Sequence, residues 1–264
     1  MEGLTDIKPL SSEQLPLVSV LINCFNGEAY LKEAIDSVYS QTYPNWELVF
    51  WDNASVDNTQ LITSAYNSKL RYFRSPELIP LHRARNLAIE KCKGTAVAFL
   101  DADDIWLPDK LERQIELFSK YHPIIYGGYK NIDQNGAKTG FVQDNCPSGR
   151  LTSRLLRKNT ISIGSVLIDK ELLLKFKFDE RYHIMGDFDL WIRLSQHYEI
   201  TSVTGLVELS RQHDSNISDT QKDKWLVERR YFYKKFLKKN SILKFPGIVL
   251  YIIKTEIKGL FNVR

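Results

Sequence analysis

The chain has few cysteines and no long apolar segment. Its 264 residues include three cysteines, whose spacing matches neither a disulfide framework nor a structural zinc site. No apolar run reaches the ~18 residues that a membrane-spanning helix needs. Residues 1–16 lack the basic and apolar regions of a secretory signal. We therefore expect a globular protein of a reducing, cytoplasmic compartment.

The glycine-rich motifs that bind phosphate are missing as well. Neither GxGxxG nor GxxxxGK[ST] occurs, so the sequence has no dinucleotide fingerprint and no P-loop. A phosphate-bearing ligand would then be held through a metal ion rather than a glycine-rich loop. The composition, with 43% hydrophobic and 26% charged residues, is otherwise that of an ordinary globular chain.

Charge is distributed unevenly along the chain. Residues 222–264 contain 12 Lys and Arg but only 3 Asp and Glu, whereas the preceding 221 residues contain 24 and 29. An acidic body followed by a basic tail indicates that the two parts contact different partners.

Strand-like and helix-like patterns alternate through the first half of the chain. Apolar, β-branched runs predict strands, and segments with apolar residues at i, i+4 and i+7 predict helices between them. The expected strands are 18–24, 46–51, 70–73 and 95–100, and the expected helices start near 31, after Asp57, at 82 and at Pro108. Such alternation favours an α/β fold of the Rossmann-like type, with a mostly parallel sheet covered by helices.

The pattern becomes irregular after Tyr121, where glycines are frequent. We expect order to return at 162–169, with a helix at 186–198 and a strand at 201–212. In the tail, 225–239 and 247–261 have amphipathic or strongly apolar patterns flanked by lysines.

Four carboxylates follow predicted strands. Asp52 ends the second strand, and Asp101, Asp103 and Asp104 end the strand at 95–100. Open α/β sheets bind ligands beyond the carboxyl ends of their strands. Clustered aspartates repel one another unless a cation lies between them, and oxygen ligands suit Mg²⁺ or Mn²⁺. The pattern therefore predicts a metal-dependent site for a nucleotide-sugar.

Several sequence blocks in order resemble glycosyltransferase family 2, inverting enzymes of the GT-A fold. The blocks are PLVSVLINCFNGEAYLKEAIDSVYSQTYPNWELVFWDNASVDNT, ARNLAI and AFLDADDIWLPDKLERQ. The resemblance extends from about Pro16 to Ser218. It implies a catalytic domain at 16–220, with a nucleotide-binding half at about 16–120 and an acceptor-side half at about 121–220. Residues 1–15 form an N-terminal extension and 221–264 a C-terminal basic, amphipathic helical region.

The resemblance also implies roles for residues of the nucleotide-binding half. Asp52 would contact the nucleoside, at uracil or ribose. Asp101 and Asp103 would form the D-x-D pair, with Asp103 the more direct metal ligand. Arg85, in ARN, would lie near the nucleotide, although from the residues alone it could equally pair with an acid.

Further roles follow for the second half. Asp187, in GDFDLWIRL, matches the catalytic aspartate of the family, although members often have Glu where this chain has Gly186. His213 matches a histidine near the diphosphate and the metal, and Arg211 is a candidate phosphate partner. The alternative for Asp187 is a first-turn acid favoured by the helix dipole. Asp189 lies about 200° around the same helix, so we expect it to be structural.

The resemblance implies a metal-dependent inverting glycosyltransferase. It would move one sugar from a nucleotide donor, UDP-linked by expectation, to an acceptor hydroxyl. Members of this type build bacterial surface polysaccharides such as O-antigen or capsule, which suggests a saccharide or lipid-linked saccharide acceptor. The two alternatives are a nucleotidyltransferase and a non-catalytic module that binds nucleotide-sugars or polysaccharides. No motif indicates nucleic-acid binding.

Two hypotheses describe the tail. Residues 222–264 could form an interfacial anchor at the cytoplasmic face of the inner membrane, attracted by anionic lipid. Alternatively, the tail could form a pair of helices packed on the catalytic domain.

Overall fold

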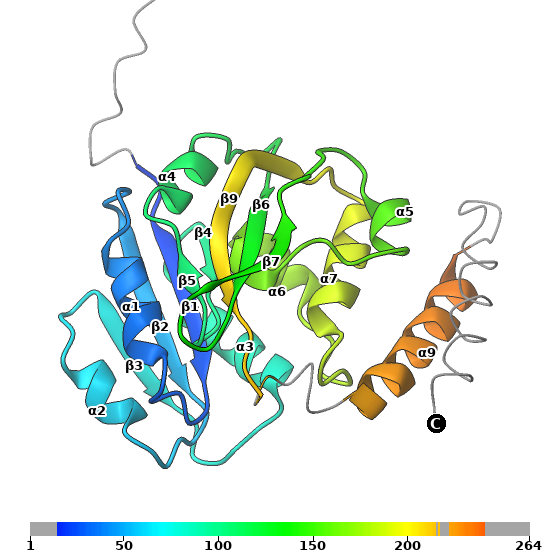
Figure 1. Ribbon diagram of the computed structural model, residues 1–264. Coiled ribbons are helices and arrows are strands. Elements are labelled where there is room, and N and C mark those ends of the chain that lie inside the picture. Colours follow the sequence, from blue (N-terminus) through cyan, green and yellow to red (C-terminus); the bar gives the residue numbers. More distant parts are fainter. Residues whose placement is uncertain (1–14, 215, 217–221, 241–264) are drawn as a thin grey trace, which may run out of the picture.

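The computed structural model describes residues 15–214, 216 and 222–240 (Figure 1). Across these residues nine strands form one sheet, in the order β3-β2-β1-β4-β8-β6-β9-β5, with β7 paired to β6. The strands are β1 (Val18–Cys24), β2 (Trp46–Asp52), β3 (Leu70–Arg74), β4 (Ala96–Phe99), β5 (Ile105–Trp106), β6 (Ile124–Ile132), β7 (Lys138–Gln143), β8 (Val166–Asp169) and β9 (Thr201–Arg211).

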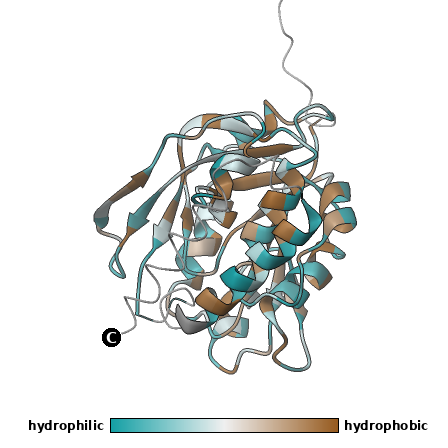
Figure 2. Ribbon diagram, turned by 90° about the vertical axis from the view of Figure 1, so that its right-hand side faces the viewer, coloured by the Kyte–Doolittle hydropathy of each residue, from teal (hydrophilic) through white to brown (hydrophobic). Residues whose placement is uncertain are grey.

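Helices connect and cover these strands. They are α1 (Leu31–Tyr39), α2 (Thr59–Ser64), α3 (Leu81–Ile89), α4 (Lys110–Ile115), α5 (Thr152–Leu155), the 3₁₀ helix η2 (Ile163–Ser165), α6 (Lys170–Phe176), α7 (Gly186–Ser195) and α9 (Lys222–Lys239). Those facing the viewer in Figure 2 carry both apolar and polar residues, as expected for helices with one face on a core.

The first half of the sheet is parallel, as the alternating pattern predicts. β1 pairs with β2 from Val18↔Trp46 to Cys24↔Asp52, and also with β4; β2 pairs with β3 in the same sense. The strand ends that carry Asp52 and precede Asp101 therefore meet at one edge of the sheet.

The second half of the sheet is mixed. β8 is antiparallel to β4 and β6, whereas β6 and β9 are parallel. The short β5, directly after the aspartate cluster, pairs antiparallel with β9, with Trp106 opposite Glu208. This pairing brings the end of β9 back to the edge where β1, β2 and β4 end.

Apolar side chains fill a core on each face of the sheet. Successive residues of β1 alternate, with Leu21 in one cluster and Val20 and Ile22 in the other. Residues of α3, α6 and α7 complete the first cluster, and residues of α1 and α4 complete the second.

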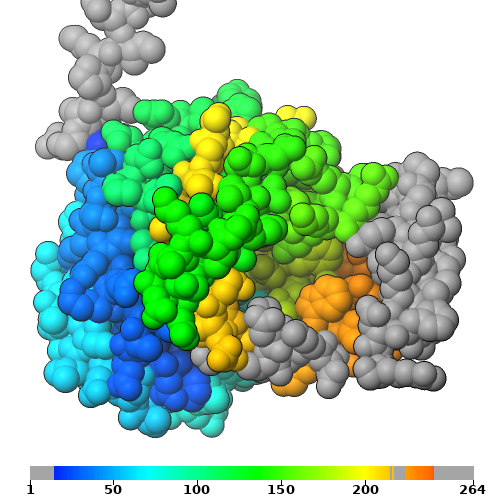
Figure 3. All heavy atoms as spheres, viewed as in Figure 1, coloured from blue at the N-terminus to red at the C-terminus, as the bar shows by residue number. Residues whose placement is uncertain are grey.

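Helix α9 shares the first of these cores. Phe232 and Phe236 are buried, and the Phe232 ring lies 4.9 Å from that of Phe188 on α7. Figure 3 shows α9, in orange, against the yellow-green surface that includes α7. Trp225, expected on the same face, is 38% exposed. The apolar face of α9 is thus covered mainly by protein.

The other part of the tail, residues 247–261, lies outside the described residues. Among the residues that the structure does describe, no helix is both long and apolar enough to cross a bilayer.

Candidate active site

Two loops at the carboxyl ends of β1 and β2 have unusual backbone conformations. Asn26 and Ala54 have positive φ angles of 53° and 66°, a region that costs non-glycine residues energy and often occurs at functional sites. The loops are tied together, because Asn26 N donates to Ser55 Oγ at 2.9 Å and Val56 N donates to Asn26 Oδ1 at 2.8 Å. The contacts hold this edge of the sheet in a fixed shape.

Asp52, the expected nucleoside contact, lies buried between these loops. Its Oδ1 accepts a hydrogen bond from Ser55 N at 2.7 Å, and its Oδ2 accepts from the Tyr72 hydroxyl and the Arg74 guanidinium. The Asp52 side chain is fully covered, whereas that of Arg74 is 39% exposed. A ligand that reached Asp52 would therefore have to displace Arg74, and Arg74 is the group of this cluster that faces solvent.

The first aspartate of the D-x-D pair is held by Arg85. Asp101 follows β4, and its Oδ1 accepts a hydrogen bond from Arg85 Nη2 at 2.9 Å. Arg85, on α3, is buried, while the Asp101 side chain is 42% exposed. Arg85 thus does pair with an acid, and the acid is one that the resemblance places near the nucleotide.

The second aspartate of the pair meets the histidine from the end of β9. Asp103 Oδ2 lies 2.9 Å from His213 Nε2, and the His213 ring lies 5.1 Å from that of Tyr30. Burial raises the pKa of the Asp103 carboxyl, as does the negative charge of Asp101, while His213 opposes the shift. A cation bound here would relieve that repulsion.

Arg211 supports the D-x-D loop from behind. Its Nε donates to the Asp103 carbonyl oxygen at 2.9 Å, its Nη1 to the Gln134 carbonyl oxygen at 3.1 Å and its Nη2 to Glu33 at 2.7 Å. The side chain is 1% exposed. In this arrangement the guanidinium is already engaged, so the expected phosphate contact would require it to exchange these partners.

Asp187 lies in the first turn of α7 and is partly exposed. Its Oδ1 accepts a hydrogen bond from the backbone N–H of Phe188 at 2.7 Å. Burial raises the pKa of Asp187, Arg85 opposes this shift and Asp101 adds to it. The charges of Arg85 and Asp101 are therefore near enough to Asp187 to influence its pKa.

Steric crowding explains why this chain has glycine at position 186. A Cβ at position 186 would lie 2.3 Å from Nε2 of His82, so the histidine ring fills the space beside this helix end. His82 is buried and stacks on Phe178, and burial lowers its pKa to about 3, so the ring is neutral. Neither of its ring nitrogens has a hydrogen-bond partner among the described residues.

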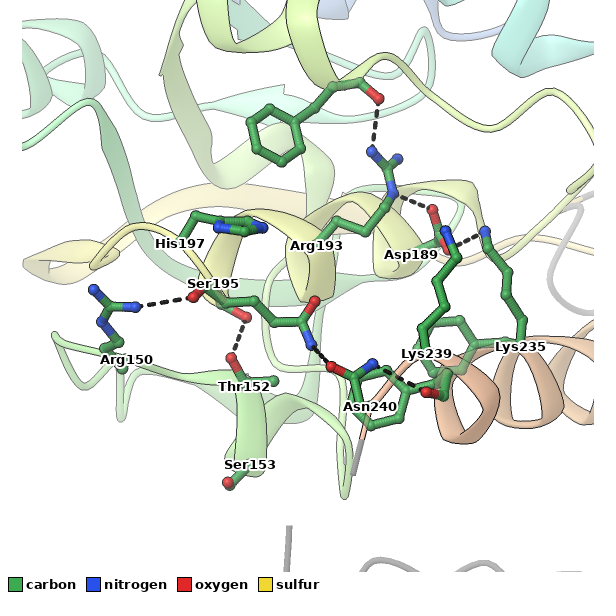
Figure 4. Close-up of a pocket in the computed structure, with 14 residues that line it drawn as sticks. Arg150, Thr152, Ser153, Asp189, Arg193, Ser195, His197, Lys235, Lys239 and Asn240 are labelled. Carbon is green, nitrogen blue, oxygen red and sulfur yellow. Dashed lines mark hydrogen bonds and ion pairs between the residues drawn. The ribbon is translucent and has the colours of Figure 1, made fainter. Parts of the chain in front are cut away.

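Asp189 faces away from this site, as its position on the helix predicts. It binds Arg193 Nε at 2.6 Å and Lys235 Nζ at 3.1 Å. Figure 4 shows these contacts in a cavity of about 640 Å³ between α7 and α9. Asp189 therefore links two helices and does not share the space of Asp187.

Asp104, one of the carboxylates that follow the expected strand at 95–100, belongs to a buried group of charged residues whose other members, Glu208 and Lys110, sequence patterns did not indicate. Asp104 is fully buried and accepts a hydrogen bond from Arg211 N at 2.7 Å. Burial and the neighbouring Glu208 raise the pKa of Asp104 well above its usual value, and burial raises that of Glu208 to about 7. Lys110 lies over the Trp106 ring at 4.0 Å, and burial lowers its pKa to about 7. No local pattern signals this network.

The donor set suits a hard divalent cation. Asp103 offers a carboxylate oxygen and His213 an imidazole nitrogen, and their 2.9 Å separation is close to the ~3 Å between adjacent ligands of an octahedral ion with bonds of ~2.1 Å. No group of three or more ligating side chains converges among the described residues. Phosphate oxygens and water would have to complete the coordination.

Comparison with known proteins identifies the family. A model described as "Glycosyl transferase family 2" matches residues 19–182. An uncharacterized glycosyltransferase of Rickettsia typhi is 32% identical over 236 residues, which cover 85% of this chain and 72% of the relative. The chain belongs to glycosyl transferase family 2, and it is a glycosyltransferase. The nucleotidyltransferase alternative is thereby excluded.

A relative whose name states its activity shares about the same sequence identity with this chain. The Escherichia coli protein WfgD, named UDP-Glc:alpha-D-GlcNAc-diphosphoundecaprenol beta-1,3-glucosyltransferase, is 32% identical over 189 residues, 71% of this chain and 73% of WfgD. Other relatives are much longer, and the chain spans 36% of one from Rickettsia felis and 27% of one from Rickettsia bellii.

Solved structures establish the fold. A crystal structure of Staphylococcus aureus TarS residues 1–349 with UDP-GlcNAc matches with a TM-score of 0.67 and 20% identity. The match covers 83% of this chain and 66% of that one. The mixed sheet and its covering helices therefore form a GT-A fold.

Proposed function

We propose that this glycosyltransferase moves one sugar from a UDP-linked donor to an acceptor hydroxyl, with inversion at the anomeric carbon. One observation carries the proposal: Arg85 binds Asp101 of the D-x-D pair and also acts on the pKa of Asp187. This shared partner supports a common site for the donor-binding loop and the base, which an in-line displacement requires.

Asp187 is the general base. In an inverting transfer the acceptor oxygen bonds to the anomeric carbon as the bond to the diphosphate oxygen breaks, and the acceptor proton must leave. The Asp187 carboxylate accepts that proton, a role that contributes ~10²–10⁴-fold. Burial raises its pKa, so it holds the proton more firmly than an exposed aspartate would.

Asp103 and His213, with Asp101 beside them, would hold Mn²⁺ or Mg²⁺ near the donor diphosphate. When bound, the ion supplies charge neutralisation for the leaving group. Arg85 supplies a fixed positive charge beside Asp101, and Arg211 keeps the loop in place through the Asp103 carbonyl. The edge formed by Asp52 and Arg74 receives the nucleoside.

The acceptor is a saccharide or lipid-linked saccharide of a bacterial surface polysaccharide. The activity that the name of WfgD states, and the name of a Bacillus subtilis relative in teichuronic acid biosynthesis, support this class. We assign donor binding to residues 16–120 and acceptor binding to 121–220. Peripheral contact with the cytoplasmic face of the membrane would use residues 222–264, whose described part exposes Lys234, Lys238 and Lys239.

A thermal-shift screen of nucleotide-sugars, with and without Mn²⁺, tests the proposal. A ligand that binds the native state raises the melting temperature by mass action. We expect a UDP-sugar to raise it only when Mn²⁺ is present, and the same sugar to be transferred. Stabilisation by no nucleotide-sugar, or transfer at full rate in a chelator, would contradict the proposal.

A further inference from the structure

The segment that carries Asp187 is held in place by α9. Residues 179–185 lead into α7 without regular secondary structure, and Asp187 is the second residue of that helix. Both Asp187 and α9 lie beyond residues 19–182, which the family model matches.

A single carboxylate on α9 satisfies three consecutive backbone donors of this segment. Glu228 Oε1 accepts a hydrogen bond from His183 N at 2.6 Å, and Oε2 accepts from Ile184 N and Met185 N, each at 3.0 Å. Glu228 is 7% exposed, so these bonds are shielded from water. Charge-assisted bonds of this kind are about twice as strong as neutral ones.

Glu228 satisfies the backbone donor of the N-cap residue of α7. That residue is Met185, whose own side chain makes no capping hydrogen bond. In a capping box, the N–H of the N-cap residue is bound by a Glu or Gln from the first turn of the same helix. Here the carboxylate comes from a helix 43 residues later in the chain, and its negative charge lies at the positive end of the helix dipole.

Two further contacts fix the segment on either side of Glu228. Lys235 Nζ lies 2.8 Å from Asp179 Oδ2, at the start of the segment, and 3.1 Å from Asp189 Oδ1 on α7. Figure 4 shows the second of these contacts. Phe232, between Glu228 and Lys235 on α9, packs on Phe188, the residue after Asp187. Three side chains of α9 thus contact residues before and after Asp187.

We propose that Glu228 is a positioning residue for the transfer reaction: it holds residues 183–185 so that Asp187 faces the acceptor hydroxyl. This inference rests on the proposed role of Asp187 as the base. If Glu228 has this role, residues 222–240 contribute to catalysis by positioning Asp187, in addition to any contact that the tail makes with the membrane. A misplacement of about 1 Å at a reacting group can cost ~10²-fold in rate.

The substitution Glu228→Gln tests the inference because it keeps the size of the side chain. The amide nitrogen cannot accept a hydrogen bond, so at least one of the backbone donors loses its partner. We expect kcat to fall by about 10- to 100-fold, with the KM of the donor unchanged within twofold. Glu116→Gln, at an exposed position of the body, is the matched control and should retain wild-type kcat.

A double-mutant cycle with Asp187→Asn separates positioning from general damage to the fold. If Glu228 acts through Asp187, adding E228Q to D187N should lower the residual rate by less than twofold. Multiplication of the two losses, or a normal kcat for E228Q alone, would overturn the inference. If E228Q does not fold, E228D retains the charge and should show the same kcat loss and the same non-additivity. A fully active D187N would instead overturn the proposed function itself.

Discussion

The Asp103 carboxylate and the His213 imidazole meet at 2.9 Å although they lie 110 residues apart. The pairing of β5 with β9 creates this contact, because it returns the end of β9 to the loop after β4. At this separation the two groups would be neighbouring ligands of the proposed cation.

Removal of the imidazole should weaken the response to metal. His213→Ala is expected to raise the Mn²⁺ concentration for half-maximal transfer by at least about 10-fold, since even partners of metal ligands contribute 10–100-fold to affinity. Manganese titration of the transfer rate measures this. The control His122→Ala, at an exposed site, should leave the Mn²⁺ concentration for half-maximal transfer unchanged. The same result for His213→Ala would show that His213 is not a metal ligand.

The pH profile should report on the base. Transfer requires ionised Asp187, whose pKa is raised by burial and lowered by Arg85. The rate is therefore expected to fall as the pH drops through that raised pKa. Arg85→Met removes the opposing charge and should move this acid limb to higher pH. The control Arg83→Met, at an exposed position, should leave the acid limb of the profile unchanged. A shift of the acid limb to lower pH in R85M would contradict the assignment of Asp187 as the base.

The Asp187 carboxyl, whose pKa is raised by partial burial, should also reduce the stability of the protein at neutral pH. Because the pKa of Asp187 is higher in the folded than in the unfolded state, protonation of its carboxyl stabilises the folded state. This stabilisation is complete below the unfolded pKa of about 3.9. That stabilisation is lost as pH rises through the folded value. Asp187→Asn should therefore raise the melting temperature more at pH 8 than at pH 4. Asp144→Asn, an exposed site, should show no such difference; equal melting shifts at both pH values for D187N would argue against a raised pKa.

Addition of a methyl group at position 186 should destabilise the protein. Gly→Ala within a helix normally stabilises by up to about 1 kcal/mol, but here the new Cβ would meet the His82 ring at 2.3 Å. Gly186→Ala is expected to lower the free energy of unfolding by about 1–3 kcal/mol, measured by urea denaturation. In a His82→Ala background the same change should become neutral or favourable. Gly140→Ala, where nothing lies within 4 Å, is the control, and additivity of G186A with H82A would refute the steric explanation.

Local patterns predicted the parts of the site that depend on local structure. The apolar run at β1 and the strand end at Asp101 follow from sequence because buried parallel strands are apolar throughout. The direction of the Asp189 side chain, away from Asp187, follows from helix geometry, and its bond to Lys235 agrees with it.

Contacts between distant segments could not be predicted in the same way. Arg211 has the sequence context of a phosphate ligand, yet its guanidinium binds carbonyl groups and Glu33, which depends on how β9 passes the D-x-D loop. Glu228 lies in a basic helix whose pattern shows an apolar face but not whether lipid or protein covers it. Only the packing of Phe232 on Phe188 decides that question for α9.

The most direct test of the site is the behaviour of Asp187→Asn with the donor identified by the thermal-shift screen. Calorimetry in the presence of Mn²⁺ should show donor affinity within about threefold of wild type, while transfer falls by at least ~10²-fold, the lower range for loss of a general base. Transfer by this variant at a near-normal rate would show that another group accepts the proton and would contradict the mechanism.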